Sequence, residues 1–325
     1  MRSEVSARAL IVFVLGVVLS SCRAAAGPTA GGAASLDPGW AGTAAPTVVQ
    51  STGPSESPSP TAVQPTATPP APSPAAGRPT APESEAAPPA CREESGTLVK
   101  FSLRPELLSS TLAGTVYLPP CYGTQPAAGY PVLYLLHGIT ETEEQWLRMG
   151  LRDQADRLIL DGEIPPLIIV MPRETTWELP PGNPYGRAVV EELVPWMDEH
   201  YLTRPGRDFR AVGGVSRGGN WAFRLGLTHP QTFGAVGVHS APLFYGDQHR
   251  ISGWLDEIPE GDVPHLYLDT GEDDQQGELT REVERILTRE NVAHSWHLFP
   301  GTHNLAYWSA HLEDYLRWYS STWRE

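Results

Sequence analysis

The segment Gly214–Gly218 reads Gly-Val-Ser-Arg-Gly, and it constrains the fold of this chain more than any other feature. It follows the short run Phe209–Gly213 and precedes a helix-like segment that begins near Gly219. A serine on so sharp a turn needs neighbours without a Cβ atom, which glycine provides. A chain with 31 glycines in 325 residues contains this spacing by chance roughly 0.2 times. Its place between a strand and a helix favours a nucleophile elbow with Ser216 at the turn.

Short apolar runs alternate with amphipathic segments after residue 91. The strands are predicted at Gly114–Leu118, Val132–Leu136, Leu167–Met171, Phe209–Val215, Ala235–Val238, Leu266–Asp269 and Ser295–Phe299. The helices are predicted at Arg152–Asp161, Arg187–His200, Gly219–Thr228, Glu278–Glu290 and Ala306–Trp318. The run Leu133–Leu136 shows no polar alternation, which is typical of a strand buried on both faces of a parallel sheet. Residues 91–325 are therefore expected to form one α/β domain, with a mostly parallel sheet and helices on both faces.

The first residues are expected to direct export. Basic residues precede the apolar stretch Ala9–Leu19, which is too short to span a bilayer stably. The sequence Leu-Ser-Ser-Cys at residues 19–22 resembles a bacterial lipobox. Residues 1–21 are therefore predicted to be a lipoprotein signal peptide, and Cys22 is predicted to carry the lipid anchor on the extracytoplasmic side. The alternative is an ordinary cleaved signal, a secreted protein and an incidental cysteine.

Residues 22–90 are predicted to be a disordered linker. They are rich in Pro, Ala, Thr, Ser and Gly and nearly lack large apolar residues, so no buried surface would offset the entropy of ordering them. Their proline content favours an extended spacer between the anchor and the domain. The net charge of −15 argues against nucleic acid or anionic lipid as a partner. The expected contact with a membrane is therefore through the lipid alone.

The three cysteines agree with an exported protein. If Cys22 carries the lipid, Cys91 and Cys121 are expected to form a disulfide bond. Such a bridge would contribute about 3–4 kcal/mol by restricting the unfolded chain. Two free thiols are the alternative, and a catalytic cysteine is not expected.

A serine hydroxyl needs a base to accept its proton and an acid to orient that base. His303 lies in the loop after the last predicted strand. Asp274 lies in the loop after the strand Leu266–Asp269, with Asp273 as the alternative acid. Both loops leave the carboxyl ends of parallel strands, where ligands bind in such sheets. We therefore expect Ser216, Asp274 and His303 to meet at that edge.

Histidines elsewhere in the chain do not indicate a metal site. His294 and His297 have a spacing that metal ligands can have, but no carboxylate or cysteine accompanies them in the pattern. Neither a metal nor a cofactor is expected.

Two backbone amides are expected to bind the oxyanion of an acyl-transfer reaction. One is the amide of Arg217, directly after the nucleophile. The other is the amide of Ile139, in the loop His137-Gly138-Ile139 that follows the strand Val132–Leu136. Glycine in this loop leaves the backbone open to substrate. The alternative is that His137-Gly138 forms only a tight turn.

The candidates for the substrate pocket follow predicted strands or carry rings: His137, Trp177, Trp221 and His239. Tyr185 and the segment Pro180–Gly182 could complete an aromatic cleft suited to a feruloyl or other aryl acyl group. Aromatic side chains are equally common in protein cores, and core packing is the alternative for these residues.

Four motifs in this order resemble one known family: Leu133–Gly138, Gly213–Gly219, Gly271–Asp274 and Gly301–Asn304. The chain is similar over residues 97–319 to the esterase family that contains esterase D, feruloyl esterase domains, enterochelin esterases and mycolyltransferases. The resemblance implies an α/β-hydrolase fold. It also implies that Ser216 is the nucleophile, His303 the base and Asp274 the acid, and that the amides of Ile139 and Arg217 bind the oxyanion.

Two positions depart from the family pattern. Arg217 stands where the family often has methionine or a small residue, and His239 stands where a small residue is common. Both are expected near the pocket, so a substrate preference does not carry over from the family.

The expected function is extracytoplasmic hydrolysis of a carboxylic ester through an acyl-enzyme. Feruloyl or acetyl esters of polysaccharides and siderophore esters are the candidate substrates, either as small molecules or linked to polymer. One alternative is an acyltransferase of the mycolyltransferase type, in which an alcohol replaces water. The other is a binding domain without catalysis.

Overall fold

The computed structural model describes residues 92–124 and 129–323. The predicted signal peptide at residues 1–21, the lipid anchor at Cys22, the linker at residues 22–90 and Cys91 lie outside the described residues. The lipid anchor, the linker and the bridge between Cys91 and Cys121 therefore stay predictions. Within the described residues, no helix combines the length and the apolar character needed to cross a membrane.

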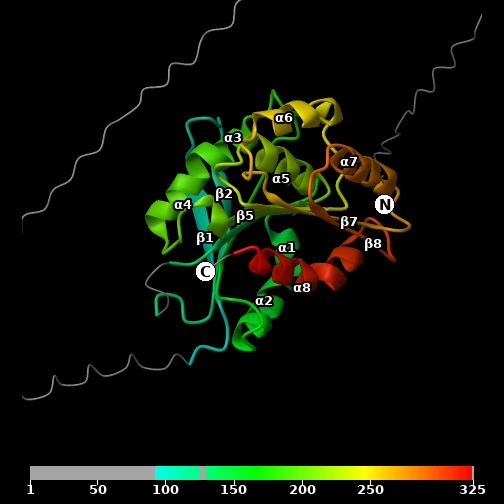
Figure 1. Ribbon diagram of the computed structural model, residues 1–325. Coiled ribbons are helices and arrows are strands. Elements are labelled where there is room, and N and C mark those ends of the chain that lie inside the picture. The colour runs from blue at the N-terminus through cyan, green and yellow to red at the C-terminus, as the bar shows by residue number, and fades with distance from the viewer. Residues whose placement is uncertain (1–91, 125–128, 324–325) are drawn as a thin grey trace, which may run out of the picture. The chain divides into compact units, whose positions relative to one another are not determined.

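The centre of the fold is an eight-stranded sheet (Figure 1). Its strands are β1 (Thr97–Leu103), β2 (Leu112–Leu118), β3 (Val132–Leu136), β4 (Ile168–Pro172), β5 (Arg210–Val215), β6 (Ala235–His239), β7 (His265–Gly271) and β8 (His294–Phe299). Their spatial order is β1-β2-β4-β3-β5-β6-β7-β8. The pairs β1–β2 and β2–β4 are antiparallel, and every other pair is parallel. The loops after β3 to β8 therefore gather at one edge of the sheet.

Helices cover both faces of this sheet (Figure 1). The helices α1 (Glu144–Arg148), α2 (Leu151–Leu160) and α8 (Leu305–Ser321) lie on one face. The other face carries α3 (Tyr185–Ala188), α4 (Val194–His200), α5 (Arg217–Thr228), α6 (Ile251–Glu257) and α7 (Gly277–Arg289). A π-helical segment, Val189–Leu193, joins α3 to α4, and short 3-10 turns lie at Arg207–Phe209 and Asp247–His249. This arrangement confirms the predicted α/β class.

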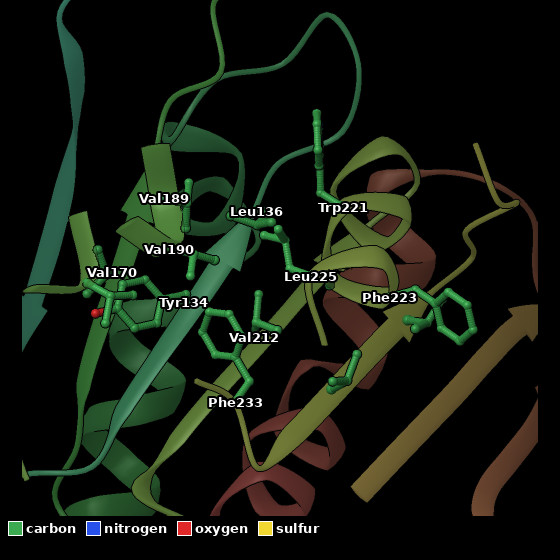
Figure 2. Close-up of a cluster of buried hydrophobic side chains, with 14 of the residues drawn as sticks. Tyr134, Leu136, Val170, Val189, Val190, Val212, Trp221, Phe223, Leu225 and Phe233 are labelled. Atoms are coloured by element: carbon green, nitrogen blue, oxygen red, sulfur yellow. The ribbon is translucent and has the colours of Figure 1, made fainter. Parts of the chain in front are cut away.

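Each face of the sheet has its own hydrophobic core. Figure 2 shows part of the larger core, where Tyr134 of β3 and Val212 of β5 lie close to Val189 and to Leu225 of α5. The second core lies between the sheet and α1, α2 and α8, and includes the fully buried Trp146. Strands β3 and β4 are buried along their whole length because both cores cover them. Their uninterrupted apolar runs follow from this double cover.

All seven predicted strands are present, with ends within two residues of the predictions, and all five predicted helices are present. Strand β1 and helices α1 and α6 were not predicted. In β1 only Phe101 is buried, because β1 is an edge strand, so its sequence carries little apolar periodicity. Helices α1 and α6 have five and seven residues, too few to show a helical period.

Candidate active site

Ser216 lies on the turn between β5 and α5, as predicted. Its φ of 51° and ψ of −121° are strained for a residue with a side chain. A Cβ atom on Gly214 would overlap the backbone of Gly218. A Cβ atom on Gly218 would overlap the carbonyl of Leu136 at the end of β3. Both glycines of the motif are therefore required by close backbone contacts, which hold the serine at the sheet edge.

The structure brings Ser216, His303 and Asp274 together. The Oγ atom of Ser216 lies 3.0 Å from Nε2 of His303, and Nδ1 of His303 lies 3.0 Å from Oδ2 of Asp274. Asp274 comes from the loop after β7 and His303 from the loop after β8, so neighbouring parallel strands deliver both. Asp273 is exposed, and the hydrogen bond from Nδ1 of His303 goes to Asp274. The acid at this position is thus Asp274.

The environment of Asp274 keeps its carboxylate ionised. Burial raises its pKa, but hydrogen bonds from His303 and from the backbone amide of Gln276 outweigh this effect and hold the pKa below its usual value. The hydroxyl of Thr270 also donates to Oδ2, at 3.2 Å. A buried carboxylate at Nδ1 keeps the proton on that nitrogen, so Nε2 is free to accept a proton from Ser216.

The loop after β3 lies beside the nucleophile. A Cβ atom on Gly138 would be 3.7 Å from the Cβ of Ser216. The amide of Gly138 donates to Oε1 of Gln145 at 2.8 Å and is therefore occupied. Within the described residues, the amides of Ile139 and Arg217 have no hydrogen-bond acceptor. The two amides that the sequence indicated are thus available as donors, and their role toward an oxyanion stays a prediction.

Trp177 and Ile139 are exposed apolar side chains in the loops after β4 and β3, at the same edge of the sheet. Ile139 is 50% exposed and Trp177 is 42% exposed. The indole of Trp177 packs edge-on against His137, with ring centroids 6.2 Å apart, and its ring lies 5.7 Å from the guanidinium carbon of Arg217.

Trp221 is buried between Tyr185 and Phe244. It forms one wall of a cavity of about 260 Å³, which Pro180 and Pro181 also line. None of the three residues Ser216, Asp274 and His303 lines this cavity. Contact between Trp221 and substrate therefore stays a prediction.

His137 does not line a pocket, so that prediction was wrong. Its ring is 2% exposed, and both nitrogens are engaged within the protein. The backbone amide of Glu174 donates to Nε2 at 2.9 Å, so the proton lies on Nδ1, which donates to the carbonyl of Gly138 at 2.8 Å. Burial lowers the pKa of His137, and the ring is neutral. His137 holds the loop after β3 in place.

His239 does not line a pocket either, and that prediction was also wrong. It is fully buried, with Nδ1 2.6 Å from Oδ1 of Asp269 and Nε2 3.0 Å from the hydroxyl of Tyr319. The other oxygen of Asp269 accepts hydrogen bonds from Tyr307 at 2.7 Å and Tyr315 at 2.9 Å. Burial and the neighbouring carboxylate raise the pKa of both tyrosines, so both hydroxyls stay protonated. These five residues form a polar cluster, hereafter the Asp269 cluster.

The Asp269 cluster lies next to the backbone of Ser216. The amide of Ser216 donates to the carbonyl of His239 at 2.9 Å, and Tyr307 lies in the first turn of α8, close behind His303. The cluster joins the ends of β6 and β7 to α8. It therefore supports the loops that carry the nucleophile and the base.

We expect Asp269→Ala to lower the free energy of unfolding by about 3–5 kcal/mol, because it leaves buried donors without their acceptor. Urea unfolding followed by tryptophan fluorescence measures this loss. Asp208→Ala is the matched control, since the Asp208 side chain is 72% exposed, and its effect should stay within about 0.5 kcal/mol. Equal midpoints for wild type and Asp269→Ala would show that the cluster contributes nothing to stability.

Sequence reasoning missed Glu174, Gln145 and Asp269. Glu174 is 3% exposed and binds Arg217 with both carboxylate oxygens, at 2.8 and 2.7 Å. Glu174 is the second residue after β4. Its place directly after a strand was the signal that could have identified it. Asp269 ends the predicted strand Leu266–Asp269, but its partners lie 30 to 46 residues away, and Gln145 binds Gly138 seven residues before it without a motif that marks the pair.

His294 and His297 make contacts with other parts of the protein. His297 stacks between Tyr267 and Phe299, and Nδ1 of His294 lies 2.8 Å from the carbonyl of Val292. In the part of the chain that the structure describes, no group of three or more His, Cys, Asp or Glu side chains could hold a metal ion.

Comparison with known proteins shows that this chain is similar to esterases. The family model described as "Putative esterase" matches residues 106–319. An endo-1,4-beta-xylanase/feruloyl esterase of Xylanibacter ruminicola is 27% identical over 221 residues, which are 62% of this chain and 29% of that protein. Esterase Rv1288 of Mycobacterium tuberculosis is 32% identical over 141 residues, 39% of this chain and 28% of that protein. The chain thus matches less than a third of each of these two relatives.

A solved ferulic acid esterase has the same fold. It superposes with a TM-score of 0.63 at 27% identity, over 70% of this chain and 99% of that chain. The family match covers all three residues Ser216, Asp274 and His303, and the order of strands and helices is that of an α/β-hydrolase. The chain belongs to this esterase family of the α/β-hydrolase fold.

Proposed function

We propose that this protein is a serine carboxylic ester hydrolase that works through an acyl-enzyme. The observation that carries the proposal is the chain of hydrogen-bond distances from Ser216 through His303 to Asp274, each 3.0 Å. Two amide donors beside the serine complete the set of groups that acyl transfer requires. Membership of the esterase family supports the same chemistry.

The reaction follows from this geometry. The Oγ atom of Ser216 bonds to the ester carbonyl carbon while its proton passes to Nε2 of His303. The carbonyl oxygen becomes an oxyanion and accepts hydrogen bonds from the amides of Ile139 and Arg217. The bond to the alcohol oxygen breaks, and His303 gives its proton to that oxygen. Water then attacks the acyl group by the same route, which releases the acid and restores the serine.

For the substrate we propose an ester of an aryl acid, such as a feruloyl group on a polysaccharide. Trp177 and Ile139 offer an indole face and an aliphatic side chain at the edge where the carbonyl must lie. An aromatic acyl group can pack on such a surface, whereas an acetyl group is too small to cover it. The names of two relatives, a feruloyl esterase and a ferulic acid esterase, support this choice.

We expect Trp177→Ala to lower kcat/KM for methyl ferulate by about 10-fold, the value of one lost ring contact of roughly 1–1.5 kcal/mol. The hydrolysis of p-nitrophenyl acetate should change little, because an acetyl group does not reach the indole. Initial rates on both esters, with the products analysed by chromatography, measure the difference.

The control for this experiment is Leu202→Ala. Leu202 is 53% exposed, and its carbonyl binds the amide of Tyr130 at the amino edge of the sheet, away from Ser216. It should leave both rates unchanged. Equal losses on the two esters for Trp177→Ala would exclude an aryl pocket at this tryptophan. Product esters formed with an added alcohol, in place of free acid, would identify an acyltransferase.

We also propose that the enzyme works outside the cytoplasm, held to a membrane by a lipid on Cys22. The lipobox-like residues 19–22 and the proline-rich segment after them support this proposal. Partition of the protein into a detergent phase, compared with the Cys22→Ser variant, tests it. A wild-type protein that stays in the aqueous phase would contradict the anchor.

A further inference from the structure

A chain of four residues connects the two amides that flank Ser216. The guanidinium of Arg217 binds both carboxylate oxygens of Glu174, and the backbone amide of Glu174 binds Nε2 of His137. Nδ1 of His137 then donates to the carbonyl of Gly138. Arg217, Glu174, His137 and Gly138 are hereafter the oxyanion relay. It runs from the residue after the nucleophile to the loop after β3.

The last link of the relay is the shorter of two hydrogen bonds that hold the peptide between Gly138 and Ile139, since the carbonyl of Gly138 also accepts from the backbone amide of Glu141 at 3.2 Å. The carbonyl of Gly138 and the N–H of Ile139 belong to one planar peptide group and point in opposite directions in a trans peptide. A donor that holds the carbonyl therefore also aims the N–H. Hydrogen bonding at the carbonyl polarises the peptide as well, which strengthens the N–H as a donor to a developing negative charge.

The relay is built as a rigid unit. His137, Glu174 and Arg217 are 2%, 3% and 6% exposed. The carboxylate of Glu174 also accepts a hydrogen bond from Asn183 at 2.8 Å, and Arg217 donates to the carbonyl of Glu178 at 2.7 Å. The paired fork geometry of guanidinium and carboxylate restricts both side chains in direction as well as distance. Movement of Arg217 would therefore be passed to His137.

We propose that Glu174, His137 and the side chain of Arg217 are positioning residues that orient the Gly138–Ile139 peptide toward the oxyanion. The proposal rests on the esterase function proposed above and extends it. It also explains why an arginine follows the nucleophile, since a methionine or a small residue there could not reach Glu174. The relay acts on the transition state, because only there does the substrate oxygen carry the charge that the peptide binds.

The decisive experiment measures kcat and KM for p-nitrophenyl acetate in Glu174→Gln and Arg217→Lys. Neither variant can form the paired, charge-assisted fork, yet both keep the size of the side chain. We expect kcat to fall about 10- to 100-fold, a smaller decrease than complete removal of an oxyanion donor would cause. KM should stay within about threefold of wild type. The affinity for an arylboronic acid, which forms a tetrahedral adduct on the serine, should fall by the same factor as kcat/KM.

A second pair of variants tests the last link. His137→Asn keeps an N–H near the position of Nδ1, whereas His137→Gln places its amide near the position of Nε2. The relay predicts a smaller loss of kcat for His137→Asn than for His137→Gln. The reverse order would overturn the assignment of the Nδ1 hydrogen bond as the one that orients the peptide.

The matched control is Arg210→Met. Arg210 is 7% exposed and binds Asp198 at 2.8 Å, but it lies at the opposite end of β5 from Ser216. It loses the ion pair of a similarly buried arginine, whose partner Asp198 is 28% exposed, so it should lose stability while kcat stays within about twofold of wild type. The relay is refuted if Arg210→Met and Glu174→Gln lower kcat equally, or if Glu174→Gln raises KM alone. Labelling of wild type by a fluorophosphonate tests the esterase function separately, because it does not depend on the relay variants.

Discussion

Replacement of Ser216 by alanine should lower kcat for p-nitrophenyl acetate by about 10⁶-fold. The hydroxyl oxygen is the atom that bonds to the carbonyl carbon, and among the residues that the structure describes Ser216 has the one hydroxyl hydrogen-bonded to Nε2 of His303. Activity somewhat above the rate in water should remain, because the two amides beside the serine still bind the oxyanion. Steady-state rates and loss of fluorophosphonate labelling measure the effect.

The fold should survive this substitution, because the Ser216 side chain contributes one hydrogen bond at the surface of the core. Ser320→Ala is the control: Ser216 and Ser320 are both 8% exposed, but Ser320 lies near the end of α8. It should keep full activity and labelling. A Ser216→Ala protein with unchanged kcat and a native thermal transition would remove the proposed mechanism.

Asp274→Asn should lower kcat by about 10⁴-fold. An amide at this place can donate a proton to Nδ1 of His303, which favours the tautomer in which Nε2 carries the proton and cannot accept one from Ser216. The amide also lacks the charge that stabilises the imidazolium formed during attack. Steady-state rates at constant pH, on protein with an unchanged circular dichroism spectrum, measure this loss.

Asp273→Asn is the matched control for this prediction. The two aspartates are adjacent, but Asp273 is exposed whereas Asp274 is buried against His303. The Asp273 variant should retain the wild-type kcat within about twofold. Equal losses in the two variants would mean that loss of negative charge in this loop, and not orientation of the imidazole, explains the effect.

Much of this site could be predicted because it depends on local sequence. The elbow around Ser216 needs glycines at defined offsets, and the loops with Asp274 and His303 each follow a strand that its apolar run reveals. The loops that follow parallel strands lie at one edge of the sheet. The order of the motifs along the chain therefore also predicted that Ser216, Asp274 and His303 lie together at that edge. For this reason the sheet and the triad geometry agree with the predictions.

The errors concern side chains whose role depends on a partner far along the chain. His239 follows the same apolar pattern as a residue that faces a pocket, but Asp269 and Tyr319, 30 and 80 residues away, hold it in the core. His137 likewise finds its partner in the loop after β4. The spacing of apolar residues shows which face of a helix or strand is buried, but it does not show which polar side chains pair with each other in the core.

Helix α8 supplies Tyr307 and Tyr315, which donate two hydrogen bonds to the Asp269 carboxylate of β7. Enclosing this charge before α8 packs on the sheet would be costly, since two of its donors would be missing. Docking of α8 and closure of the ends of β6 and β7 should therefore occur in one cooperative step of folding. Because the amide of Ser216 binds the carbonyl of His239 in β6, the nucleophile should take its final position in that same step.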